Sequence, residues 1–133
     1  MKFSITAAAV FIKNKKVLLE KRRTNEDNYA GMWALPGGHK RKKETIYNAL
    51  KREMREELRI NVKRFKPVGI FKDKDSTSNE MFHHHAFLCQ EWKHDIKKSY
   101  EQDKLKWWNL NKFNNVPNHR KIDEKVLKQL KLI

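Results

Sequence analysis

The segment from residue 44 to residue 58 constrains the fold of this chain more than any other. Its apolar residues recur at three- and four-residue spacing, which predicts a helix with one apolar face. They are Ile46, Ala49, Leu50, Met54 and Leu58. Such a helix has to bury that face against another layer, and a sheet is the usual partner when strand-like segments stand on both sides of it.

Strand-like segments do precede and follow this helix. Residues Phe3 to Ile12 and Lys16 to Arg22 predict two strands joined by a turn at Asn14–Lys15. Further predicted elements are strands at Lys66–Lys72, Met81–Trp92 and Leu105–Leu110, a polar loop at Asp73–Asn79 and a helix at Ile122–Leu132. This order predicts an α/β (α+β) fold, a mixed β-sheet sandwiched between helices, in a single domain spanning residues 1–133.

Composition limits the classes of function. The formal charge is +15, from 31 Lys and Arg against 16 Asp and Glu, which suits partners that carry phosphates. The lysines are spread along the whole chain, and a general bias in composition would give the same distribution. A nucleic-acid partner is therefore possible but not favoured. No apolar run approaches the ~20 residues that span a bilayer. Cys89 is the only cysteine, which excludes an intrachain disulfide and favours a cytoplasmic protein.

The polar face of the predicted helix carries Glu53, Glu56 and Glu57 at positions i, i+3 and i+4. Three neighbouring carboxylates repel one another, and hard divalent cations that prefer oxygen ligands relieve the repulsion. Arg52 adjoins them and is placed to orient Glu53. Taken alone, the same pattern is also typical of a charged surface helix in water. The preceding Pro36-Gly37-Gly38 turn favours a metal site, because glycine lets the backbone carbonyl approach a cation.

Residues 38–60 resemble the Nudix box. That box has a glycine, five residues, a glutamate, seven residues, Arg-Glu, an aliphatic residue, any residue, Glu-Glu, any residue, a glycine and an aliphatic residue. The matching positions are Gly38, Glu44, Arg52, Glu53, Met54, Glu56, Glu57 and Ile60. The lead-in from Gly31 to Gly37 is similar to that of MutT-type members. Arg59 stands where the family has the glycine that ends the helix with positive φ. Either the helix ends differently here or Arg59 adopts a strained conformation.

The resemblance implies a Nudix fold and a metal-dependent pyrophosphohydrolase. Magnesium, with manganese as a substitute, is then expected to bind the Gly38 carbonyl and the carboxylates of Glu53, Glu56 and Glu57. Arg52 would act with Glu53 in catalysis, and Glu44 and Gly37 would support the site. The general base varies in the family. Glu53 and a later loop carboxylate are both candidates, with Glu101 preferred to Asp103 in that loop.

The resemblance also implies substrate contacts. Arg23, preferred to its neighbour Arg22, is expected to reach substrate phosphate. Leu35, Asn118 and His119 are expected near the nucleobase of the substrate. His83-His84-His85 cannot all meet one ion in a strand, because consecutive side chains point to opposite faces, so one of them is expected to line the base pocket or to pack on the sheet.

Subfamily markers of hydrolases acting on ADP-ribose, diadenosine polyphosphates and NADH are missing. The favoured substrate is therefore a nucleoside triphosphate, oxidised or non-standard ones included, cleaved to nucleoside monophosphate and pyrophosphate. Two alternatives stay open: pyrophosphate removal from the 5′ end of RNA, and a non-catalytic domain that binds nucleotide or RNA. The expected partner is a small nucleotide and not a membrane, and the expected assembly is a monomer or a homodimer.

Overall fold

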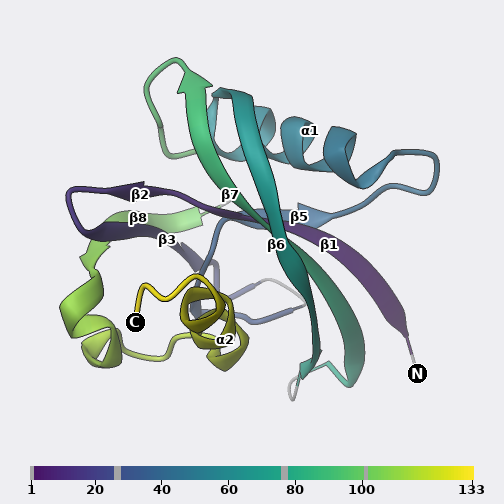
Figure 1. Ribbon diagram of the computed structural model, residues 1–133. Coiled ribbons are helices and arrows are strands. Elements are labelled where there is room, and N and C mark those ends of the chain that lie inside the picture. Colours follow the sequence, from purple (N-terminus) through teal and green to yellow (C-terminus); the bar gives the residue numbers. More distant parts are fainter. Residues whose placement is uncertain (1, 26–27, 76–77, 101) are drawn as a thin grey trace.

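The computed structural model describes residues 2–25, 28–75, 78–100 and 102–133, and Figure 1 shows its elements. The first half of the chain forms β1 (Phe3–Val10), β2 (Ile12–Lys13), β3 (Lys16–Arg22), β4 (Trp33–Ala34), β5 (Gly37–His39) and α1 (Ile46–Leu58). The second half forms β6 (Asn61–Asp75), β7 (Glu80–Lys93), β8 (Gln102–Asn109), a 3-10 helix η1 (Leu110–Asn115) and α2 (Lys121–Gln129). Neither α1 nor α2 is long and apolar enough to cross a membrane, and the same holds for every helix within the described ranges.

A four-stranded mixed sheet in the order β5-β1-β7-β6 lies between the two α-helices (Figure 1). β1 pairs parallel with β7, and the other two pairings are antiparallel. Because side chains alternate along a strand, β1 serves both faces. Ala7 and Ala9 pack in one core cluster with α1, whereas Ala8 and Val10 pack in the other with α2. This arrangement confirms the predicted fold class.

A second sheet was not foreseen from the sequence. β3 is its central strand, bordered by β4 and β8, and β2 extends it as a hairpin. The predicted strand Phe3–Ile12 is in fact divided at Phe11, where the chain leaves the first sheet for the second. Its apolar pattern continues across the break because Phe11 is fully buried, so hydrophobicity alone did not reveal the division.

Two further predictions are corrected by the strand pairing. β6 begins at Asn61 and ends at Asp75, so it is longer than the predicted Lys66–Lys72, and part of the predicted loop is strand. Polar Asp75 stays extended because it is buried and accepts a hydrogen bond from the Tyr29 N–H. Gly37 and Gly38, predicted as a turn, form β5 and pair with Ala8 and Ala7 of β1.

The end of α1 settles the conformation at Arg59. Thr45 caps the start of the helix by accepting from the Asn48 N–H, and the helix ends at Arg59, which is left-handed with φ 59° and ψ 35°. The Arg59 N–H donates to the carbonyls of Arg55 and Met54. Arg59 therefore adopts the geometry that a glycine adopts at no steric cost, and a non-glycine residue pays about 1 kcal/mol or more for it.

We expect Arg59→Gly to raise the free energy of unfolding by up to about 1 kcal/mol, since it removes the left-handed strain from an exposed residue. Arg55→Gly is the matched control, because it makes the same change at an exposed position inside α1 and should lower stability by about 1 kcal/mol. Urea unfolding measures both. Equal losses in the two variants would contradict the strain at Arg59.

Candidate active site

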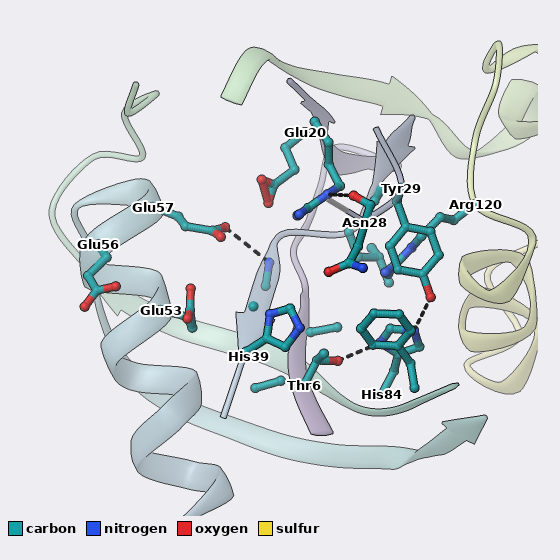
Figure 2. A pocket seen from close by; sticks show the side chains of 18 of the residues that line it. Thr6, Glu20, Asn28, Tyr29, His39, Glu53, Glu56, Glu57, His84 and Arg120 are labelled. Atoms are coloured by element: carbon teal, nitrogen blue, oxygen red, sulfur yellow. Dashed lines mark hydrogen bonds between the residues drawn. The ribbon is translucent and has the colours of Figure 1, made fainter. Parts of the chain in front are cut away.

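A pocket of about 500 Å³ opens between α1, β5, β3 and the start of α2 (Figure 2). Its two ends differ in chemistry. Glu53, Glu56 and Glu57 of α1 line one end, and Tyr29 and Arg120 line the other. A cavity of this size accommodates a small ligand, and its divided lining suits a molecule with one strongly polar end.

Arg52 holds the acidic end in position. Its Nε and Nη2 donate to the two carboxylate oxygens of Glu44, at 2.5 and 2.8 Å. Its Nη1 donates to Glu53 at 2.9 Å and to Glu56 at 3.2 Å, and Nη2 also reaches the carbonyl of His39 at 2.9 Å. The Arg52 hydrogen bond lowers the pKa of Glu44 to about 2. One guanidinium thus ties α1 to the loop before it and to β5.

The three helix carboxylates take different positions in the pocket. Glu57 is buried and accepts from the Gly37 N–H at 3.2 Å. Glu53 is buried too and faces Gly38, whereas Glu56 lies at the rim with a side chain 41% exposed, paired with Arg52 and Arg41 (Figure 2). Across the described residues, no three acidic, histidine or cysteine side chains already converge on one metal position. The carboxylate oxygens are nevertheless the ligands that magnesium prefers, so the donor set fits such a cation.

Glu20 belongs to the same end and was missed in the sequence. It comes from the middle of β3, is buried, and points toward Glu57 (Figure 2). Burial raises the pKa of its carboxyl group to about 7, and the nearby Glu57 carboxyl group and Gly37 backbone partly oppose that rise. A signal was available, because the alternation of side chains places Glu20 on the same face as Arg22, and Arg22 also lines the pocket.

Gly37 and Gly38 allow β5 to lie close to both neighbours. A Cβ added at Gly37 would come within 2.1 Å of the carbonyl oxygen of Ala7, which is backbone of the paired strand. A Cβ added at Gly38 would come within 2.5 Å of the carboxylate of Glu53, which is the end of a side chain. The first contact can be relieved only by moving a strand, the second by turning a side chain.

We therefore expect the two glycine variants to differ. Gly37→Ala should lower the free energy of unfolding by about 1–3 kcal/mol, as other over-packed sites do. Gly38→Ala should change stability much less and should displace Glu53, which would show as loss of activity. Thermal unfolding beside a turnover assay separates the two effects. A larger loss of stability in Gly38→Ala than in Gly37→Ala would contradict this account.

A chain of hydrogen bonds, buried except at Asp73, begins at the opposite end of the pocket. The Thr6 hydroxyl bonds His84 Nδ1 at 2.6 Å, and His84 Nε2 lies 3.0 Å from the Tyr29 hydroxyl. That hydroxyl donates to Asp73 at 2.9 Å. Burial lowers the pKa of His84 to about 2, so the ring is neutral at physiological pH. Phe82 stacks on His84 with its ring centroid 5.2 Å away, which adds an apolar surface.

Arg120, at the start of α2, completes this end. Its guanidinium lies 4.7 Å from the Tyr29 ring centroid and donates twice to Asp123, at 3.0 and 2.7 Å. Asp123 also accepts from the Leu35 N–H at 3.2 Å. Both members of this ion pair are buried, which fixes the start of α2 against the pocket.

The structure does not bring together all of the residues predicted to contact substrate. Leu35 lines the pocket, but Arg22 does so in place of Arg23, which follows β3 and donates to the Tyr100 carbonyl. Asn118 and His119 do not line it, because their side chains are turned toward Gly31 and Glu124; Arg120 takes this place. His84 is the histidine of the His83-His84-His85 run that lines the pocket.

Of the two loop carboxylates predicted as alternative general bases, one is described by the structure. Glu101 lies outside the described residues. Asp103 lies on β8, is exposed, and lines a separate hollow with Trp33 and Lys104. Glu20, Asn28, Tyr29 and Arg120 are among the pocket residues that were not anticipated, and apart from Glu20 these come from loops and helix ends, where no periodicity guides a prediction.

Comparison with known proteins gives consistent findings. The family model of the NUDIX domain matches residues 3–130. A CTP pyrophosphohydrolase of Escherichia coli (strain K12) is 31% identical over 109 residues, covering 80% of this chain and 76% of that protein. A MutT NUDIX hydrolase from Burkholderia pseudomallei has a crystal structure with TM-score 0.83 at 22% identity, covering 98% and 99% of the two chains. The solution structure of the E. coli ORF135 protein gives 0.79 at 27% identity, with 98% and 90% covered.

Proposed function

The chain belongs to the NUDIX family and hydrolyses pyrophosphate bonds of nucleotide-linked compounds, and on this premise we propose that its substrate is a nucleoside triphosphate. The products are a nucleoside monophosphate and pyrophosphate. The observation that carries the proposal is the pocket with two unlike ends (Figure 2). Its acidic end suits a divalent cation that binds the substrate phosphates, and its aromatic end suits the nucleobase.

NUDIX hydrolases work with divalent metals, and we propose magnesium here, with manganese as a substitute. Glu53, Glu56 and Glu57 would hold it together with the Gly38 carbonyl. Bound there, the cation supplies neutralisation of the phosphate charge and a bound water of lowered pKa. The support is the set of carboxylate oxygens that line one end of the pocket beside β5.

The chain's own residues would position the reaction. Arg52 donates to the carboxylate of Glu53 at 2.9 Å and so orients it, and Glu53 is our proposed base. A carboxylate of the segment 101–103 is the alternative. Arg22 lines the same pocket and donates to the Asn28 carbonyl through Nε, and we propose that its guanidinium pairs with a phosphate oxygen.

The aromatic end supports a single nucleotide. Tyr29 and Phe82 offer ring faces to a base, and Arg120 offers a guanidinium whose partner Asp123 holds it in one orientation. The E. coli relative is a CTP pyrophosphohydrolase, which makes CTP and dCTP the first nucleotides to test, followed by oxidised and other non-standard triphosphates.

The test is a panel of nucleoside triphosphates with magnesium, in which products are separated by ion-exchange chromatography. We expect monophosphate and pyrophosphate in equal amounts. Release of diphosphate and inorganic phosphate would refute the proposed cleavage, and absence of turnover across the panel would refute the substrate class.

RNA carrying a 5′-triphosphate belongs in the same panel, because one observation favours it as a second substrate. The chain has a formal charge of +15, and Arg41 of the basic run Lys40–Lys43 lines the pocket. A clear preference for 5′-triphosphorylated RNA over free nucleotides would replace our first proposal. Binding of RNA without turnover, with steep salt dependence, would indicate the non-catalytic alternative.

A further inference from the structure

Glu20 is a buried residue of β3 that lines the pocket, and in Figure 2 it lies across from α1. It is 3% exposed, and its Oε1 has no hydrogen-bond partner among the residues that the structure describes. The strand that carries it is held on both sides, since Glu20 pairs with Ala34 of β4 and with Leu105 of β8. A buried carboxylate oxygen without a partner costs free energy, so a fixed one facing a pocket calls for a ligand.

Glu57 of α1 is a second buried carboxylate, and it lies beside Glu20. The carboxyl groups of Glu20 and Glu57 interact with each other, and the Gly37 N–H donates to Glu57 at 3.2 Å. Two carboxylates in contact cannot both be ionised without a counter-charge between them. Arg22 and Arg120 supply part of that charge from nearby. The remainder is a proton shared by the pair or a cation held by it.

We propose that Glu20 and Glu57 form a divalent-cation position that joins β3 to α1, with Glu20 Oε1 as a ligand. This position adds a β3 residue to the carboxylates of the Nudix box. The inference rests on the proposed function in that the cation would lie beside the substrate phosphates. In Figure 2 the side chains of Glu20 and Glu57 point toward each other from β3 and α1.

The experiment titrates the nucleotide-free protein with Mn²⁺ by calorimetry and follows free Mn²⁺ by electron paramagnetic resonance. We expect Glu20→Gln, which keeps the side-chain volume, to weaken Mn²⁺ binding by at least about 10-fold or to remove one bound ion. Glu80→Gln is the control, since Glu80 is a buried carboxylate bonded to Ser4 and Asn28 and should leave Mn²⁺ binding unchanged. Circular dichroism checks folding, and Glu20→Ala serves as a second variant.

The outcomes separate this inference from the proposed function. If Mn²⁺ binds Glu20→Gln as it binds the wild type, or if the nucleotide-free wild type binds no Mn²⁺, the inference is overturned. Hydrolysis of nucleoside triphosphates by the wild type would leave the proposed function intact in that case. If Mn²⁺ binding depends on Glu20 but no nucleotide is hydrolysed, the cation position holds and the proposed function fails.

Discussion

Glu57→Gln is expected to reduce kcat for nucleotide hydrolysis by on the order of 10²–10³-fold, the loss typical when one strong electrostatic group is removed from an active site. The substitution removes a negative charge that, in the proposed mechanism, holds a divalent cation. It retains a carbonyl oxygen that accepts from the Gly37 N–H, so β5 should keep its place. Steady-state kinetics with saturating magnesium measures the effect.

The matched control is Glu91→Gln, which makes the same change of charge on β7, where Glu91 is exposed and pairs only loosely with Arg64 at 3.6 Å. It should leave kcat unchanged. Thermal unfolding should find both variants folded. An undiminished rate in Glu57→Gln would contradict the role of this carboxylate.

Asp123→Ala is expected to lower the free energy of unfolding by about 3–5 kcal/mol, because it leaves a buried charge without its partner. Asp123 is 1% exposed and takes two hydrogen bonds from Arg120, which is itself buried. The Leu35 N–H loses its acceptor in the same step. Urea unfolding followed by circular dichroism gives the size of the loss.

Glu124→Ala provides the comparison on the same helix. Glu124 is partly exposed and pairs with His119, and exposed or half-exposed pairs contribute less than about 1 kcal/mol. Replacing Arg120 and Asp123 together by Met and Leu should recover much of the stability, because no buried charge then remains unpaired. Equal losses for Asp123→Ala and Glu124→Ala would refute the importance of burial at this pair.

The sequence predicted those parts of the molecule that depend on periodicity. The apolar stripe of α1 predicted the helix and hence the positions of its three glutamates, and the turn signal at Asn14–Lys15 led to a strand with the bounds of β3, Lys16 and Arg22. The second sheet was not predicted because it depends on long-range pairing of β3 with β8, in which Lys16 pairs with Asn109 and Arg22 with Gln102. Nothing local distinguishes that pairing from a continuation of the first sheet.

The site was predicted to the same extent and for the same reason. Glu53 and Glu57 follow from helical spacing, but the aromatic end is assembled from a loop residue, Tyr29, and from the N-terminal boundary of α2 at Arg120. Helix boundaries are uncertain by a few residues in any reading of periodicity, and the family resemblance pointed to Asn118 and His119, the two residues before Arg120. Glu20 was overlooked because it begins a run of charged residues, with Lys21 and Arg22 next to it, that resembles an exposed strand end.

A crystal structure of the protein with Mn²⁺ and a non-hydrolysable nucleoside triphosphate analogue tests the central claim most directly. We predict anomalous density between the carboxylates of α1 and β5, phosphates beside it, and the base against Tyr29 and Arg120. Phosphates and metal bound outside this pocket, or a nucleotide lying in it in the reverse direction, would contradict the account.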